Sequence, residues 1–149
     1  MVSVDSDSLQ LKIIDFGSSI MGNKGYGIVG SKHYAAPEVF TSLSYDSFKS
    51  DIWSLGVVFV YIYYFKFVKW SVANEREDEN FKVYKRNERY ESVVKEDNQV
   101  QTQTDATGNQ LAEEPWLICL VLDMLKVQPT KRVVTTSELL RRIQQYCVV

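Results

Sequence analysis

The chain has 149 residues, of which 45% are hydrophobic and 24% charged, and its formal net charge is −2. This length fits one domain with a sizeable core, and the composition is average for globular chains. The slightly acidic balance provides no basic field to attract nucleic acid, so we expect no nucleic-acid partner. The two cysteines, Cys119 and Cys147, lie in apolar helix-like segments, where we expect reduced, buried thiols rather than a disulfide framework.

Targeting signals are not evident in the sequence. The first residues, "MVSVDSDS", have neither a basic start nor an apolar core, so we do not expect secretion. The stretch 52–70 is strongly apolar, but Lys66 and Lys69 interrupt it, and an uncharged run of about 14 residues is short for a bilayer. We therefore expect a buried helix, no membrane partner and a cytoplasmic or nuclear protein.

The first residues predict a β-hairpin. Two short apolar or β-branched runs, at 2–4 and 11–14, are separated by "DSDSLQ", whose side chains favour turns. The glycine-rich stretch 17–36 has no sustained period, which indicates an exposed loop shaped by whatever it docks against.

Helices are predicted over most of the remaining chain. An apolar run that begins at Lys49-Ser50-Asp51 and extends to about Phe65 indicates a helix buried on nearly all sides. Residues 74–110 are polar and predict a surface helix followed by a mobile Gln/Thr-rich loop. We therefore expect a mainly α chain with a small N-terminal β-hairpin.

Two further helices follow Pro115. The first places five apolar residues on one stripe and stops at Gln128-Pro129; the stripe comprises Leu117, Leu120, Val121, Met124 and Leu125. The second has capping-box spacing between Thr135 and Glu138 and one apolar face of Leu139, Ile143 and Tyr146.

A G-x-G-x-x-G pattern at 25–30 could signify a dinucleotide or nucleotide phosphate site. Such a site needs a strand before the glycines and either a helix or a lysine-bearing strand after them. Here "SKHYAAPEV" follows, Pro37 blocks a continuous helix, and no V-A-x-K lysine is present. We interpret the glycines as loop flexibility and keep dinucleotide binding as a minor alternative.

Several other motifs occur in a fixed order along the chain. Asp15-Phe16-Gly17 is followed by "GSKHYAAPEVF", then "SDIWSLGVVF", then "MLKVQPTKRVV". Together they resemble the C-terminal lobe of a eukaryotic-type serine/threonine protein kinase, over nearly the whole chain. The resemblance implies a truncated α+β kinase fold over residues 1–149: hairpin and DFG at 2–17, activation segment at 18–38, and helical lobe at 39–149.

The resemblance also assigns roles to residues. Asp15 would hold Mg²⁺ against the phosphates of ATP, and Phe16 and Gly17 would set its position. Ser18, Ser19, Tyr26 and Ser31 would be available for phosphorylation, although any exposed loop offers such hydroxyls. Ser31, Lys32, His33 and Tyr34 would face the substrate, and Ser31 matches serine/threonine rather than tyrosine kinases.

Five residues receive structural roles from the same resemblance. Glu38 would pair with Arg132 and fix the activation segment to the lobe. Asp51 would accept hydrogen bonds from backbone amides of a catalytic loop, and Trp53, with Leu55, would lie in the core.

The glycine loop, the strand lysine and the H-R-D-x-x-x-x-N catalytic loop have no counterpart in the sequence. We therefore expect a kinase fragment without catalytic residues of its own. ATP and Mg²⁺ would serve the full-length form and would not bind tightly here. The partner would be a protein substrate, a missing N-terminal half or another kinase. The alternative is a non-catalytic kinase-like interaction module.

Overall fold

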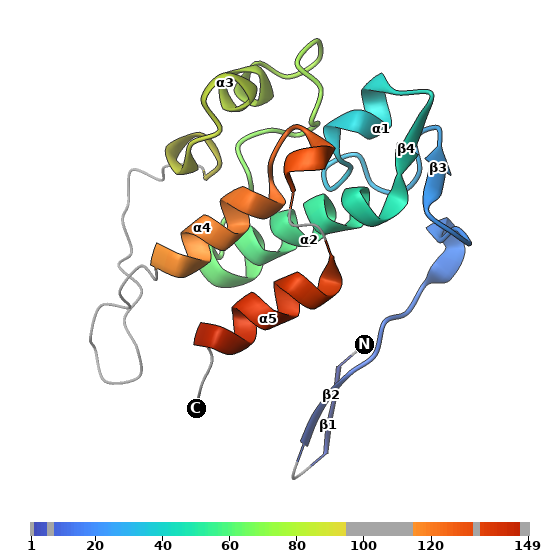
Figure 1. The fold of residues 1–149 in the computed structure, drawn as a ribbon, viewed down its shortest axis with the longest axis vertical. Coiled ribbons are helices and arrows are strands. Elements are labelled where there is room, and N and C mark those ends of the chain that lie inside the picture. The colour runs from blue at the N-terminus through green and yellow to red at the C-terminus, as the bar shows by residue number, and fades with distance from the viewer. Residues whose placement is uncertain (1, 6–7, 95–114, 133–134, 147–149) are drawn as a thin grey trace.

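The computed structural model describes residues 2–5, 8–94, 115–132 and 135–146 (Figure 1). It is mostly helical, with two small antiparallel sheets. The elements are, in order, β1 (Val2–Asp5), β2 (Ser8–Leu11), η1 (Phe16–Ser18), β3 (Lys24–Tyr26), α1 (Pro37–Thr41), β4 (Ser44–Asp46), α2 (Ser47–Tyr64), α3 (Glu79–Asn87), η2 (Tyr90–Ser92), α4 (Pro115–Met124), η3 (Pro129–Lys131) and α5 (Thr136–Tyr146).

The expected N-terminal hairpin is confirmed, but its second strand lies earlier than predicted. β1 and β2 pair antiparallel from Val2 opposite Leu11 to Asp5 opposite Ser8. The second strand ends at Leu11, so residues 12–14, which we expected to belong to it, lie outside it. Figure 1 shows the hairpin projecting away from the helical body.

The long apolar run forms α2, which starts earlier than predicted. The Asp46 side chain caps the helix by accepting a hydrogen bond from the Lys49 amide at 3.2 Å, so the first helical residue is Ser47. Phe65 ends the helix in a left-handed conformation. The predicted start at residues 49–51 is wrong because Asp46, a better-placed cap, precedes it.

Burial of α2 is one-sided. Ile52, Trp53, Val57 and Val60 are buried, whereas Ile62 is 61% exposed. The expectation of burial on nearly all sides is therefore wrong for the described residues. Leu55 is 38% exposed and does not lie in the core as we expected. The exposed face of α2 is a large apolar surface that the described parts of the chain leave uncovered.

The core forms where α2 packs against α4. Gly56 makes this approach possible, since a Cβ atom added there would lie 3.0 Å from side-chain atoms of Met124 and Leu125. All five residues of the stripe predicted after Pro115 are buried. That prediction is confirmed.

An aromatic cluster extends this core towards α3. The ring centroids of Trp53 and Trp70 are 5.9 Å apart, and those of Trp70 and Tyr84 are 4.7 Å apart. Phe81 packs against the same rings. The Tyr84 hydroxyl donates a hydrogen bond to the Leu125 carbonyl oxygen at 2.7 Å. The polar helix predicted within 74–110 therefore has a buried aromatic face.

The final helix begins as its capping signal predicts. The Glu138 amide donates to the Thr135 hydroxyl at 3.1 Å, and Leu139 is buried. In α4, Cys119 is a free and exposed thiol, so the expectation that it is buried is wrong. Cys147 lies outside the described residues, as does the predicted Gln/Thr-rich loop.

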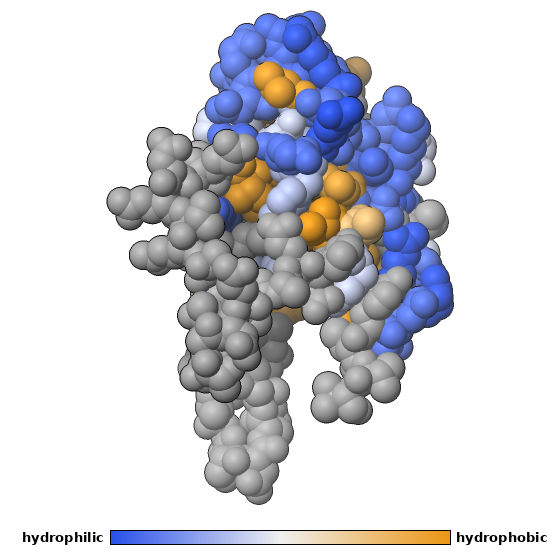
Figure 2. All heavy atoms as spheres, turned by 90° about the vertical axis from the view of Figure 1, so that its left-hand side faces the viewer, coloured by the Kyte–Doolittle hydropathy of each residue, from blue (hydrophilic) through white to orange (hydrophobic). Residues whose placement is uncertain are grey.

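Figure 2 shows hydrophobic atoms in a central band of one face, below the hydrophilic surface of α3. Apolar surface is thus not confined to the interior. Within the described residues, no helix is both long and apolar enough to cross a membrane.

Candidate functional site

The Asp15-Phe16-Gly17 tripeptide lies on the surface after the hairpin. Asp15 adopts a left-handed backbone conformation, with φ at 63°, and its carboxylate accepts a hydrogen bond from the Gly17 amide at 3.3 Å. Phe16 is 67% exposed. Within the described ranges, no three potential ligand side chains cluster around a metal position. Asp15 can thus supply one hard oxygen ligand, and a bound Mg²⁺ would need further oxygens from phosphates or water.

The glycine-rich segment after this tripeptide is anchored, which the sequence did not predict. Strand β3 pairs antiparallel with β4, with Lys24 opposite Asp46 and Tyr26 opposite Ser44. The Ser47 amide donates to the Asn23 carbonyl, and the Ser47 hydroxyl donates to the Gly22 carbonyl, both at 3.0 Å. The segment is therefore held against the start of α2.

Gly25 explains part of the G-x-G-x-x-G pattern. It is buried opposite Tyr45, and a Cβ atom at Gly25 would come into hard contact with the Tyr45 ring. Gly27 and Gly30 have positive φ values of 65° and 80°, a region that favours glycine. Our interpretation of these glycines as loop flexibility is therefore incomplete, because Gly25 serves close packing and the other two serve turns.

The hydroxyl residues proposed for phosphorylation are accessible. Ser18, Ser19, Tyr26 and Ser31 are all exposed. The Lys24 ammonium lies 5.6 Å from the centroid of the Tyr26 ring.

Residues 31–34 form a tight turn before α1. The Tyr34 amide donates to the Ser31 carbonyl at 3.0 Å, and the Tyr34 carbonyl accepts from the Ser54 hydroxyl of α2 at 2.9 Å. Lys32 is exposed. His33 is half-buried against the rings of Tyr34 and Phe67, and its buried Nε2 has no hydrogen-bond partner among the described residues.

Glu38 and Arg132, which are far apart in the sequence, lie together. Two hydrogen bonds of 2.5 and 2.6 Å join the guanidinium nitrogens to the two carboxylate oxygens, in the bidentate geometry that Arg favours. Arg132 is 1% exposed and Glu38 is also buried. The end of the glycine-rich segment is thereby fixed to the loop between α4 and α5.

Arg132 also connects other parts of the body. It donates to the carbonyl oxygens of Lys126 at 2.7 Å and Lys49 at 2.9 Å. Its guanidinium lies 5.0 Å from the centroid of the Trp53 ring. Thus one buried cation joins α1, the first turn of α2 and the segment before η3, and its charge is compensated by Glu38.

Asp51 lies on the second turn of α2, beside a cavity of about 540 Å³. The lining includes Phe16, Ser18, Ser31 and Asp51, so the structure brings these predicted site residues around one space. Desolvation by burial raises the pKa of Asp51 above its ordinary value.

The sequence reasoning did not identify the residues that position this site. Tyr45 and Ser47 hold the glycine-rich segment, and Ser54 holds the turn at 31–34. Of these positioning features, only the Asp46 cap could have been found from the sequence, because an acidic residue just before an apolar run is a typical helix start. A three-residue strand pair such as β3–β4 leaves no periodic pattern.

A family model of the protein kinase domain matches residues 2–143. The chain belongs to the protein kinase domain family. Protein kinases use ATP and Mg²⁺ and act on protein substrates. Serine/threonine-protein kinases are among the relatives whose sequences resemble this chain.

Relatives include the serine/threonine-protein kinase ppk8 of Schizosaccharomyces pombe, which is 36% identical over 52% of this chain and 16% of its own length. The probable serine/threonine-protein kinase RTK1 of Saccharomyces cerevisiae is 31% identical over 78% of this chain and 21% of its own. The SIK3 homolog of Danio rerio is 50% identical over 34% and 4%. This kinase chain thus spans about a fifth or less of these relatives. No solved structure matches it.

Proposed function

We propose that this chain is the C-terminal-lobe part of a serine/threonine kinase domain. Its parts would be the hairpin with the DFG tripeptide at 2–17, the activation segment at 18–38 and the helical lobe at 39–149. The complete domain would transfer the γ-phosphate of ATP to serine or threonine hydroxyls of proteins. The buried Glu38–Arg132 pair carries this proposal, because it ties the end of the segment that follows Asp15-Phe16-Gly17 to the helical body.

In this proposal Asp15 is one ligand of the Mg²⁺ that accompanies ATP. Its exposed carboxylate fits that task, since its own intramolecular contact is a 3.3 Å hydrogen bond from Gly17. Ser31, Lys32, His33 and Tyr34 present the protein substrate, and Ser18, Ser19 and Tyr26 accept regulatory phosphates. Exposure of the three hydroxyls and the fixed turn at 31–34 support these roles.

Phosphoryl transfer depends on a catalytic base, a phosphate-binding lysine and metal ligands held together. This sequence contains no H-R-D or V-A-x-K motif. We therefore propose that the chain alone is inactive and acts with another polypeptide segment that supplies these groups. Two features support such a partner: the exposed apolar face of α2 and the cavity beside Asp51.

Mapping the transcript that encodes the chain tests this proposal. A transcript that extends upstream of Met1 into a frame containing H-R-D would support it. Expression of that longer chain should then give Mg²⁺-dependent phosphorylation of serine or threonine in a protein substrate. A mapped 5′ end with no such frame, together with no H-R-D-bearing partner on purification, would refute the enzymatic function.

A non-catalytic interaction module is the second candidate. The observations that favour it are the exposed apolar residues of α2 and the finding that Asp15 belongs to no group of three or more potential metal ligands within the described residues. For this function a partner protein should co-purify with the chain while Mg-ATP gives no thermal shift. A clear thermal shift with Mg-ATP that Asp15→Asn abolishes would exclude it.

A further inference from the structure

Three aromatic side chains form a continuous surface beside the turn at residues 31–34. They are His33 in the turn, Tyr61 near the end of α2, and Phe67 just after α2, and we call them the aromatic shelf. The ring centroids of Tyr61 and Phe67 are 4.8 Å apart, and those of His33 and Phe67 are 5.8 Å apart. Ring contacts at these distances are attractive, so the shelf joins the turn to the end of α2.

The shelf is accessible to a ligand. Tyr61 is 46% exposed and Phe67 is 51% exposed, although each ring is held by the other. Rings that are already ordered lose little conformational entropy when a ligand binds. Exposed aromatic faces of this kind can take up an apolar side chain.

The turn beside the shelf is fixed as well. The Tyr34 carbonyl accepts a hydrogen bond from the Ser54 hydroxyl at 2.9 Å, and the Tyr34 amide donates to the Ser31 carbonyl at 3.0 Å. The ring of His33 contacts the ring of Tyr34, with the centroids 5.3 Å apart. Because His33 belongs both to the turn and to the shelf, a peptide that lies along residues 31–34 also has side chains close to the shelf.

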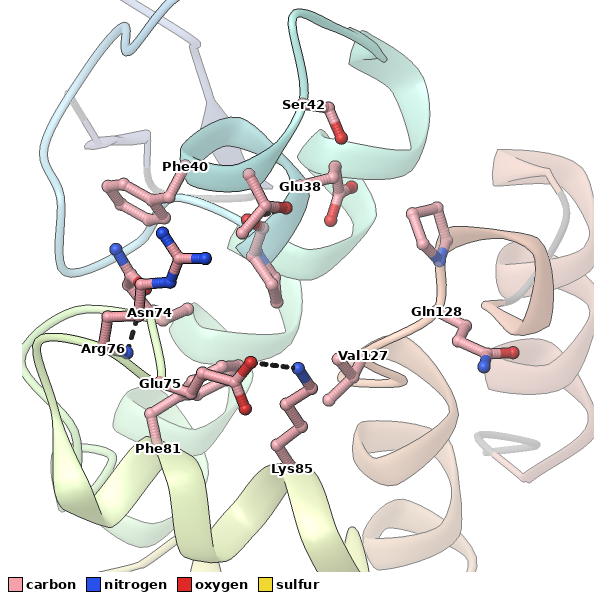
Figure 3. A pocket seen from close by; sticks show the side chains of 14 residues that line it. Glu38, Phe40, Ser42, Asn74, Glu75, Arg76, Phe81, Lys85, Val127 and Gln128 are labelled. Atoms are coloured by element: carbon pink, nitrogen blue, oxygen red, sulfur yellow. Dashed lines mark hydrogen bonds and ion pairs between the residues drawn. The ribbon is translucent and has the colours of Figure 1, made fainter.

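The sequence around the shelf has no free carboxylate to offer a basic ligand. No Asp or Glu occurs within five positions of Tyr61 or Phe67. Glu38 is five positions from His33, but Figure 3 shows it in the wall of a separate cavity of about 440 Å³, at the seam between α1, α3 and η3. There its carboxylate is paired with Arg132.

The charged residues that flank the shelf in the sequence are basic. Lys32 precedes His33, and Lys66 precedes Phe67. Like charges disfavour an arginine or lysine side chain of a ligand, whereas the aromatic rings favour an apolar one. The chemistry of the shelf therefore discriminates between these two kinds of ligand.

We propose that the aromatic shelf selects protein substrates that carry an aromatic or large aliphatic side chain close to the phosphorylated serine or threonine, and that it disfavours Arg or Lys there. Tyr61 and Phe67 are the specificity-determining residues, and His33 sets the shelf beside the substrate-facing turn. This selectivity rests on the proposed function, because it describes the substrate of the same site.

The test is fluorescence anisotropy with the whole chain in the absence of ATP. Labelled nine-residue peptides have Ser at the centre of a Gly/Ala background and one Phe at any other position. Two control pools have Arg or Ala in place of Phe. We expect the Phe pool to bind at least about fivefold more tightly than either control pool.

Variants locate the binding to the shelf. Tyr61→Ser and Phe67→Ser should each weaken binding of the Phe pool by about fivefold, because contact area is lost. Ile62→Ser is the matched control, since Ile62 is the next residue on α2 and is also exposed, and it should leave binding within about twofold. Circular dichroism checks that each variant keeps its fold.

A charge placed on the shelf should change its selectivity. Tyr61→Glu adds a carboxylate beside Phe67, so the Arg pool should then bind more tightly than the Phe pool. A merely structural role of Tyr61 would not produce this reversal, because loss of structure weakens binding of both pools.

Four results would overturn the proposal. The three pools could bind equally, Tyr61→Ser and Ile62→Ser could lose affinity equally, or Tyr61→Glu could keep the preference for Phe. A dimer of the chain that Tyr61→Glu dissociates would also overturn it, because a second copy would then cover the shelf. Since no ATP is present, an absent preference for Phe does not count against phosphoryl transfer by the complete domain, and an inactive complete domain does not alter this measurement.

Discussion

Arg132 and Glu38 show how a buried charge can organise a small body. The pair leaves little uncompensated charge, and the remaining guanidinium hydrogens bond backbone carbonyl oxygens. A buried pair of this kind contributes mainly to the geometry of the segments it joins, because the loss of hydration offsets much of its attraction. Replacing one partner lowers the free energy of unfolding more than replacing both, because the remaining charge then stays buried without a partner.

The first prediction concerns this pair. Arg132→Met should lower the free energy of unfolding by about 3–5 kcal/mol, because Glu38 remains buried without its partner. Urea unfolding followed by tryptophan fluorescence measures the change. Lys131→Met, at an exposed neighbour, serves as the control, and Glu38→Gln with Arg132→Met should recover part of the loss. A loss below about 1 kcal/mol would contradict the account.

The second prediction concerns Asp51. Burial raises the pKa of the Asp51 carboxyl above its ordinary value of 3.8. Between these two pKa values the folded chain therefore binds more protons than the unfolded chain. As pH rises above 3.8, the Asp51 carboxyl consequently lowers the free energy of unfolding. Asp51→Asn should therefore raise the melting temperature at pH 7 and have little effect at pH 3. A lower melting temperature at pH 7 would show that the carboxylate has a stabilising partner in the folded chain.

At the scale of elements, β3 and β4 hold the glycine-rich segment through a short ribbon rather than through a charge. The ribbon depends on the close approach of Gly25 to the Tyr45 ring. It joins a segment with exposed hydroxyl residues to the start of α2, so its integrity decides how that segment is presented.

The third prediction tests this ribbon. Gly25→Ala should open it, because the added methyl group overlaps the Tyr45 ring, and amide hydrogen exchange at residues 24–26 should become faster. Adding Tyr45→Ala removes the clashing ring atoms and should restore part of the protection, whereas Lys24→Ala alone should change it little. Unchanged exchange in Gly25→Ala would show that the ribbon does not depend on this packing.

The elements also show what the sequence can predict. The apolar stripe of α4 and the Thr135–Glu138 cap follow the helical period, and both were predictable. The sequence offers two polar stretches that could begin α2, one at Asp46 and one at residues 49–51. In the structure only Asp46 caps the helix, so α2 starts earlier than predicted. The β3–β4 pairing could not be predicted, since it consists of only three residue pairs whose members lie about twenty positions apart in the sequence.

At the scale of the whole molecule, the described residues form a packed interior and leave one apolar side of α2 exposed. The interior is formed by α2, α4 and the aromatic rings of Trp53, Trp70 and Tyr84. Ile62 and Phe65 near the end of α2 remain largely exposed. Exposed apolar surface of this kind is typical of an interface, which supports the proposal that the chain acts together with another polypeptide segment.

The sequence motifs of the site could be predicted, but the spatial arrangement of its residues could not. The order of Asp15-Phe16-Gly17, Ala36-Pro37-Glu38 and Arg132 indicated the family, which the family match bears out. The cavity at the seam of α1, α3 and η3 could not be read from the sequence, because its lining comes from four separate stretches of the chain.

The most direct measurement is phosphoryl transfer by this chain fused after the preceding part of the kinase domain of the similar yeast protein RTK1. We predict that the chain alone transfers no phosphate from Mg-ATP to a serine/threonine protein substrate. The fusion should transfer it, and Asp15→Asn should reduce the rate by at least about a hundredfold because a metal ligand is lost. Transfer by the isolated chain, or a folded fusion whose activity is indifferent to Asp15→Asn, would contradict it.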